Sequence, residues 1–364
     1  FVGHATLREL VLGEDWKRPA RPEEVARMAA LVEEAMQEGA VGLSTGLEYD
    51  IGFHATTEEV IALAQAAAKY GGIYMSHIRD EDSGVFDALR EAIRIGEEGG
   101  LPVQISHIKL ASVPVWGKAS EVIALIAAAQ KHGVDITADC YPYQAWSSTI
   151  TVIVPNRRYT DPESVAAGLA ENGGAGNILI THCRKHPEYE FRTLEEIAQA
   201  RGITPVELYI EIVQEGGASV VGHTMMEEDV RAFYTQPWVM VASDGGIGLR
   251  HPRSAGTFPK VLGRYVRAQG WLTLEEAIRK MTSLSAQRLG LTDRGVIAEG
   301  MKADLVVFDP ERIVDRSTFQ EPELLPAGVE RVFVNGVEVW ADGQATGVRP
   351  GRVIRHRAAV AVAK

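Results

Sequence analysis

The stretch IYMSHIRDEDSGVFDALREAIRIGEEGGLPVQISH, residues 73–107, decides the fold because it contains a complete β-α-β unit. It opens with a short apolar run, Ile73–Ser76, and closes with a second one, Val103–Ser106, and both are typical of buried strands. Between them, Val85–Glu98 has helical spacing and is followed by the helix-terminating pair Gly99-Gly100. Two strands joined by one crossover helix run parallel, so the stretch predicts a parallel sheet.

The same alternation extends along the chain in both directions. On the N-terminal side, a strand at Ala40–Ser44 precedes a helix over Thr57–Tyr70. On the C-terminal side, a helix over Ala119–His132 precedes a strand at Val134–Ala138. Strands that are apolar on both faces are expected where helices cover one side and a barrel core fills the other. The pattern therefore predicts an α/β protein with parallel, barrel-like architecture.

The alternation of strands and helices becomes less regular after about residue 161, and the pattern changes after Gly295. Further elements are predicted as short strands at Ile178–Ile180 and Val220–Val221, a strong strand at Trp238–Ala242, and helices over Thr257–Ala268 and Thr273–Leu289, the second broken near Ser283. The last part is predicted to form strands only, at Asp304–Phe308, Val329–Val334 and Val337–Trp340, the last two joined as a hairpin by Asn335-Gly336. A separate small β element is therefore expected at the C-terminal end.

Composition limits the classes of protein that are possible. A chain of 364 residues with 46% hydrophobic residues has room for one large domain, or one large and one small domain. The formal net charge of −12 argues against nucleic acid as a partner, and no apolar run has the ~18–20 residues that a membrane span needs. With only Cys140 and Cys183, no disulfide framework is possible, which fits a reducing compartment, and we expect a cytoplasmic protein.

Three polar residues stand directly after predicted strands: His77, His107 and Asp244. Singly, each has an ordinary structural explanation, as a hydrogen-bonded histidine at a strand end or as a turn or cap aspartate. In a parallel barrel, however, the C-terminal ends of all strands open on one face, where catalytic groups collect. Because imidazole suits zinc and a carboxylate either binds metal or moves protons, the three positions together predict a metal centre.

These residues lie in motifs that resemble the N-acyl-D-amino-acid deacylase (D-aminoacylase) family of the metal-dependent amidohydrolase superfamily. The resemblance covers essentially the whole chain, and SHIRDE, SHIK and YPY in this order are specific to the deacylase branch. The matching stretches are GLSTGLEY (Gly42–Tyr49), SHIRDE (Ser76–Glu81), SHIK (Ser106–Lys109), DCYPY (Asp139–Tyr143), ASDGG (Ala242–Gly246), HPRSAGTFPKVLGRY (His251–Tyr265) and GVIAEGMKADLVVFDP (Gly295–Pro310).

The resemblance implies a distorted (β/α)8 barrel with a small β-sandwich, one or two zinc ions, and hydrolysis of N-acyl-D-amino acids. It makes His77 and His107 zinc ligands, and Asp244 a metal-site residue and the general acid/base. We expect the barrel over residues 1–292, with a lid-like insertion around 155–236, and a sandwich portion over 293–364. The family's His-x-His pair and early metal-binding Cys have no counterpart here, so the chain resembles a deacylase without its N-terminal part.

The substrate of such an enzyme carries a free carboxylate, which calls for a cation with planar donors. Arg253 is the best candidate because a guanidinium grips a carboxylate through two hydrogen bonds. The family match agrees and adds Tyr141 and Ser147 as hydroxyl donors, with Lys109 as a further contact. The expected partner is thus a small N-acyl amino acid.

Two alternatives remain open from the sequence. One is a cyclic amidase of the same superfamily, similar to dihydroorotase or hydantoinase. The other is a truncated, non-catalytic barrel, because an incomplete ligand set binds zinc poorly. We interpret Glu48 as structural, Cys140 and Cys183 as inert thiols, and the pair His182-Cys183 as unrelated to the metal.

Overall fold

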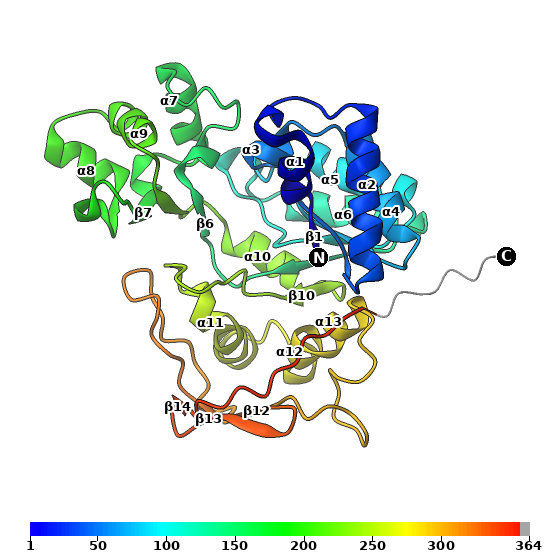
Figure 1. Ribbon diagram of the computed structural model, residues 1–364. Helices are drawn as coiled ribbons and strands as arrows, with labels where there is room; N and C mark the ends of the chain where they lie inside the picture. Colours follow the sequence, from blue (N-terminus) through cyan, green and yellow to red (C-terminus); the bar gives the residue numbers. More distant parts are fainter. Residues whose placement is uncertain (357–364) are drawn as a thin grey trace.

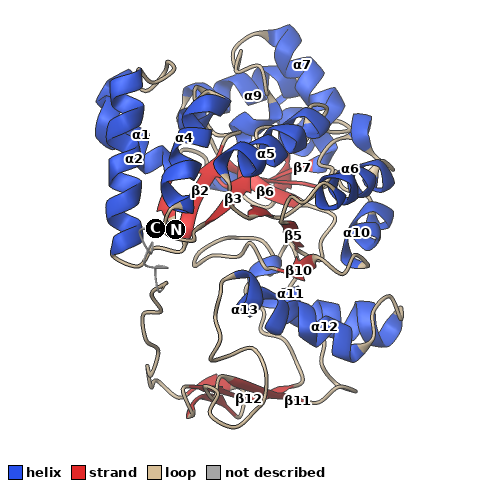
Figure 2. Cartoon of the chain, turned by 90° about the vertical axis from the view of Figure 1, so that its right-hand side faces the viewer, coloured by secondary structure: helices blue, strands red, loops and turns tan. Residues whose placement is uncertain are grey.

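A computed structural model describes residues 1–356 and is built around a parallel sheet (Figures 1 and 2). The sheet has the order β1-β2-β3-β4-β5-β10, and in the described part of the chain it is open, with β1 and β10 at its edges. Its strands are β1 (Val2–Gly3), β2 (Gly42–Gly46), β3 (Ile73–His77), β4 (Val103–Ile105), β5 (Ile136–Cys140) and β10 (Val239–Val241). Every neighbouring pair is parallel, so all carboxyl ends meet at one edge of the sheet.

Helices connect these strands and cover one side of the sheet, as the sequence predicted. They are α1 (His4–Leu12), α2 (Pro22–Gln37), α3 (Asp50–Phe53), α4 (Thr57–Ala68), α5 (Val85–Gly99) and α6 (Ala119–Lys131). Helix α5 buries the face that carries Leu89 and Ala92. The residue that follows the helix and caps it is Gly100, whose φ of 70° suits glycine. A Cβ at Gly96 would stand 2.3 Å from Val103 Cγ2, so only glycine lets α5 pack this closely on β4.

A second, antiparallel sheet of order β6-β9-β7-β8 lies between β5 and β10 in sequence. Its strands are β6 (Trp146–Thr149), β7 (Ile178–His182), β8 (Arg192–Thr193) and β9 (Ser219–Gly222), and its helices are α7 (Pro162–Glu171), α8 (Leu194–Arg201), α9 (Pro205–Gln214) and α10 (Glu227–Tyr234). This sheet belongs to the region where we expected an insertion, although it begins nine residues before residue 155. Its first strand follows β5 after only five residues, which brings it close to the carboxyl ends of the parallel strands.

The C-terminal part contains helices and a small antiparallel sheet, β11-β12-β13-β14, at the other end of the molecule (Figure 1). The elements are α11 (Arg253–Lys260) continued by a π-helix (Val261–Ala268), α12 (Leu274–Met281), α13 (Ser283–Arg288), β11 (Leu305–Phe308), β12 (Val329–Val334), β13 (Val337–Ala341) and β14 (Gln344–Ala345). The hairpin turn has positive φ at both Asn335 and Gly336, and the predicted helix break falls at Thr282. Residues 357–364 of the expected sandwich portion lie outside the described residues.

One hydrophobic cluster joins the parallel sheet to its helices, with Val103 and Ile105 of β4 packed among residues such as Leu89 of α5. Among the described residues, none of the helices combines the length and the apolar character required to cross a membrane. The core therefore holds the strand ends rigidly, and the loops that follow them carry the polar groups described next.

Candidate metal centre and active site

A small polar cavity of about 90 Å³ lies at the carboxyl ends of the parallel strands. His77 is the last residue of β3, His107 lies two residues beyond β4, and Tyr141 directly follows β5. The cavity is lined by Glu48, Tyr49, His77, Glu81, Asp82, His107, Lys109, Ala111, Tyr141, Trp146, Ser147, Ser148, Val152, Asn172, Asp244 and Arg253. All of the residues predicted for the site, Asp244 and Arg253 among them, thus face one space.

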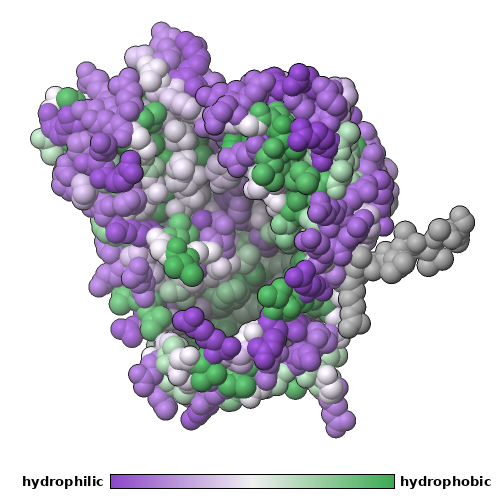
Figure 3. All heavy atoms as spheres, viewed as in Figure 1, coloured by the Kyte–Doolittle hydropathy of each residue, from purple (hydrophilic) through white to green (hydrophobic). Residues whose placement is uncertain are grey.

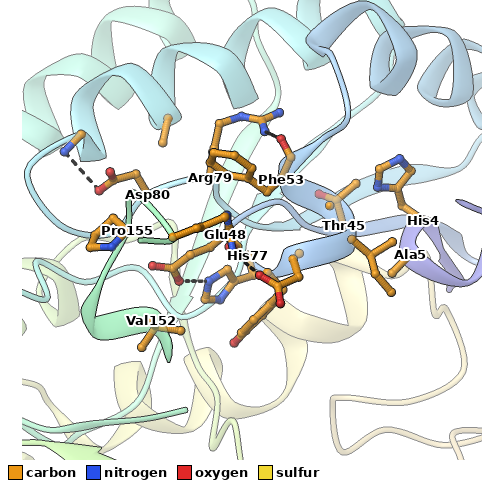
Figure 4. A pocket seen from close by; sticks show the side chains of 18 of the residues that line it. His4, Ala5, Thr45, Glu48, Phe53, His77, Arg79, Asp80, Val152 and Pro155 are labelled. Atoms are coloured by element: carbon orange, nitrogen blue, oxygen red, sulfur yellow. Dashed lines mark hydrogen bonds and ion pairs between the residues drawn. The ribbon is translucent and has the colours of Figure 1, made fainter. Parts of the chain in front are cut away.

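This cavity adjoins a larger cleft of about 1020 Å³. The two share Glu48, Tyr49, His77 and Val152 as lining residues. Figure 4 shows Glu48, His77 and Val152 close together on the wall of this cleft. Figure 3 shows a deep hollow in the middle of one face of the molecule, with hydrophobic residues along much of its visible floor. A substrate larger than the polar cavity therefore has room to extend from it.

The two predicted histidine ligands face each other across the cavity. His77 Nδ1 lies 3.0 Å from His107 Nε2, and the rings are inclined at 71°. His107 has a φ of 39°, which is unusual for a residue with a side chain. Its backbone N–H donates to Asp139 Oδ1 at 2.8 Å, while Gln104 donates to Asp139 Oδ2 at 2.6 Å. The buried Asp139 carboxylate therefore fixes the backbone from which the second imidazole projects.

The outer ring nitrogens of both histidines contact carboxylates. His77 Nε2 lies 2.5 Å from Glu48 Oε2, the contact that is drawn as a dashed line in Figure 4. His107 Nδ1 lies 3.0 Å from Glu81 Oε1. Carboxylates in this position orient metal-binding imidazoles and raise their basicity. The inner nitrogens, His77 Nδ1 and His107 Nε2, are therefore the ones directed toward a common ion.

Glu81 is the third member of a compact group of possible metal ligands, together with His77 and His107, whose atoms lie within 4.8 Å of one another. Lys109 Nζ lies 2.5 Å from Glu81 Oε1 and 2.7 Å from His107 Nδ1. Burial alone would raise the pKa of Glu81, but the charges of His77, Lys109 and His107 outweigh burial and hold this pKa well below its usual value. Glu81 is thus an anion at the centre of the site.

The donor set fits a zinc ion. Imidazole nitrogens and carboxylate oxygens are the ligands that zinc prefers in catalytic sites. The ammonium of Lys109 is paired with Glu81 Oε1, so an ion bound beside the two histidines would compete with Lys109 for this carboxylate. The residues that would hold the ion are therefore His77 and His107, with Glu81 beside them.

Asp244 lies outside this compact group, although the sequence suggested that it would join the metal ligands. Its Oδ2 pairs with Arg253 Nη1 at 2.8 Å, and its own φ is 46°. The Arg253 guanidinium also lies over the ring of Tyr141, with its carbon 4.7 Å from the ring centre. Asp244 and Arg253 are therefore engaged with each other, and a metal role for Asp244 stays a prediction.

The other predicted substrate contacts have different surroundings. The Tyr141 hydroxyl donates to Met225 Sδ at 3.8 Å, and Ser147 lies on β6, opposite Val221 of β9. Lys109 lines the cavity, and its ammonium is bound to Glu81 and His107, so its contact with a substrate stays a prediction.

Sequence reasoning missed the importance of two carboxylates. Glu81 stands four residues after His77 in the SHIRDE motif, and that short spacing was the available signal. Glu48, which we interpreted as structural, contacts His77 directly. His182 is separate from the site, since its largely exposed ring pairs with Glu190. Burial raises the pKa of the Cys140 thiol, in keeping with the inert role expected for it.

Comparison with known proteins gives consistent results. Residues 1–340 match the amidohydrolase family. The chain is 41% identical over 361 residues to a D-aminoacylase of Alcaligenes xylosoxydans xylosoxydans, an alignment that covers 99% of this chain and 70% of that relative. A crystal structure of D-aminoacylase superposes with a TM-score of 0.86 at 40% identity, over 97% of this chain and 70% of the other.

An N-acyl-D-glutamate deacylase of Bordetella bronchiseptica, crystallised with zinc and a phosphonate inhibitor that mimics the tetrahedral intermediate, also superposes with a TM-score of 0.86. It is 36% identical, and the alignment covers 97% of this chain and 70% of that structure. These similarities confirm the amidohydrolase fold that the sequence predicted.

Proposed function

Because this chain belongs to the amidohydrolase family, we propose that it hydrolyses the amide bond of N-acyl-D-amino acids with the help of zinc. The observation that carries the proposal is the pair of inner imidazole nitrogens, 3.0 Å apart, at the ends of two adjacent parallel strands. The 41% identity to a D-aminoacylase supports a linear N-acyl amide as the substrate. The buried, free thiols of Cys140 and Cys183 agree with a cytoplasmic location.

His77 and His107, with Glu81 beside them, would hold the metal. When bound, zinc supplies a Lewis acid for the carbonyl oxygen and lowers the pKa of a coordinated water toward about 7. Glu48 keeps His77 oriented through its outer nitrogen, and Glu81 does the same for His107. These contacts hold both inner nitrogens in place before any substrate arrives.

Asp244 is the proposed general acid/base. It accepts a proton from the attacking water as the water oxygen bonds to the acyl carbon, and it returns a proton to the amine nitrogen as the C–N bond breaks. The products are a carboxylate and a free D-amino acid. In the structure Asp244 is paired with Arg253, so a substrate carboxylate that takes over the guanidinium would release Asp244 for this task.

Paired substrates provide the direct test. Zinc-loaded protein should hydrolyse N-acetyl-D-methionine much faster than N-acetyl-L-methionine, lose activity with a chelator, and regain it with zinc. The variants His77→Asn and His107→Asn should bind less zinc, whereas His182→Asn, which alters a side chain with 57% exposure, should bind it normally. Equal hydrolysis of both enantiomers, or activity that survives the chelator, would contradict the proposal.

A further inference from the structure

Two buried polar side chains of the catalytic cavity lack a partner. Asp82, in the loop between β3 and α5, is 8% exposed, and no donor to its carboxylate lies within hydrogen-bond distance in the described chain. Asn172, at the C-terminal end of α7, is 2% exposed. Its Nδ2 donates to the Gly168 carbonyl at 2.9 Å, which fixes the orientation of the amide, and its Oδ1 has no partner within residues 1–356.

Both unpartnered groups accept hydrogen bonds, so what the cavity lacks at this place is a donor. Buried acceptors are normally satisfied by the protein or by a ligand, because burial without a partner destabilises a neutral group and a charged one still more. Asp82 and Asn172 line the same small polar cavity, so the two segments lie near each other.

The charge balance indicates what kind of donor is missing. The carboxyl groups of Glu48, Glu81, Asp82 and Asp244 all line this cavity.

The cations of the cavity are already engaged. Lys109 is bound to Glu81, and Arg253 is bound to Asp244. This end of the cavity thus has an excess of negative charge, which a cationic donor would balance.

We propose that Asp82 and Asn172 form a subsite for an ammonium or guanidinium group on the substrate's side chain. The inference rests on the proposed function and narrows its substrates to N-acyl-D-amino acids with cationic side chains, such as N-acyl-D-lysine or N-acyl-D-arginine. Asp82 provides the countercharge, and Asn172 Oδ1, which is buried without a partner among the described residues, provides a second acceptor. The uncharged part of the side chain occupies the space shared with the larger cleft.

The test compares substrates that differ only in the terminal group. Zinc-loaded protein is assayed with N-acetyl-D-lysine, N-acetyl-D-norleucine and N-acetyl-D-glutamate. One lost charge-assisted contact changes binding by roughly 10- to 100-fold, so kcat/KM should favour the lysine derivative over norleucine by about 30-fold, with glutamate poorest. In Asp82→Asn the lysine-to-norleucine ratio should fall about 10-fold or more.

Glu58→Gln is the matched control, because it removes a carboxylate whose side chain is 69% exposed and which lines neither the polar cavity nor the larger cleft. It should leave the lysine-to-norleucine ratio within about 2-fold of its original value. A wild-type preference for norleucine or glutamate, or an unchanged ratio in Asp82→Asn, would overturn the cationic subsite while leaving the hydrolase assignment intact.

Calorimetric binding to the zinc-free protein separates the two proposals. If no substrate is turned over but N-acetyl-D-lysine binds more tightly than N-acetyl-D-norleucine, and does so through Asp82, the subsite stands and the hydrolase assignment fails. If the two ligands bind equally, the subsite is refuted whatever the activity.

Discussion

Replacing Asp139 by alanine tests how the fold holds the second imidazole. Asp139 is buried, and its two oxygens accept hydrogen bonds from the His107 backbone N–H at 2.8 Å and from Gln104 Nε2 at 2.6 Å. Both donors would be left buried without an acceptor. The loss also removes the contact that keeps His107 at its φ of 39°, a backbone conformation that costs about 1–3 kcal/mol unless the surroundings impose it.

The magnitude follows from these contacts. Two hydrogen bonds to a charged acceptor contribute about 3–6 kcal/mol together. Removing the carboxylate recovers part of this, because its charge is no longer desolvated. We therefore expect Asp139→Ala to lower the free energy of unfolding by about 2–3 kcal/mol and, through the displaced His107, to weaken zinc binding by about 10-fold or more.

Urea unfolding monitored by circular dichroism gives the stability change, and competition with a chromophoric chelator gives the zinc affinity. Asp87→Ala is the control: its side chain is 90% exposed and its partner Arg90 is 60% exposed, so its loss should cost less than about 1 kcal/mol. If Asp139→Ala unfolds at the same urea concentration as the control and binds zinc normally, Asp139 does not position His107.

Three further results are expected. Asp244→Asn should abolish turnover of N-acetyl-D-amino acids with zinc still bound, since the side chain lies outside the compact group of possible ligands; loss of zinc, measured by metal analysis, would contradict this. Arg253→Lys should raise KM by about 10-fold or more with a smaller change in kcat, because an ammonium cannot form the two parallel hydrogen bonds that a guanidinium makes with a carboxylate. An unchanged KM would show that Arg253 does not recognise the substrate carboxylate. Glu59→Gln should destabilise the fold by about 2–4 kcal/mol, because the buried Arg8 donates to both Glu59 oxygens and would lose its charged partner. Burial opposes ionisation of Glu59, but hydrogen bonds from His4 and Arg8 hold its pKa below the usual value. The wild-type advantage over Glu59→Gln should therefore be complete above about pH 5. It should decrease once pH falls below the pKa of the unfolded carboxyl group, about 4.3, and be lost as pH falls through the lowered pKa of the folded one. An advantage that does not change with pH would refute this assignment.

Much of the fold followed from local patterns in the sequence. The apolar runs around Ile73–Ser76 and Val103–Ser106 became β3 and β4, and Val85–Glu98 became α5, because burial and periodicity act over a few residues. The hairpin at Asn335-Gly336 was equally local, since its turn requires positive φ at both positions. Element ends were less well determined, and the helix expected from Thr257 in fact begins at Arg253.

The sequence by itself also determined which strand ends carry imidazole. A histidine that directly follows an apolar run lies at the carboxyl end of that strand, and in a parallel sheet all these ends lie at the same edge. Only the tertiary structure decided the partners of these groups. It put Glu81 beside the two histidines, paired Asp244 with Arg253, and placed Asp82 in the wall of the same cavity. Such contacts join loops that are distant in sequence, and their energies depend on distances of a few ångströms and on burial, neither of which local residue patterns encode.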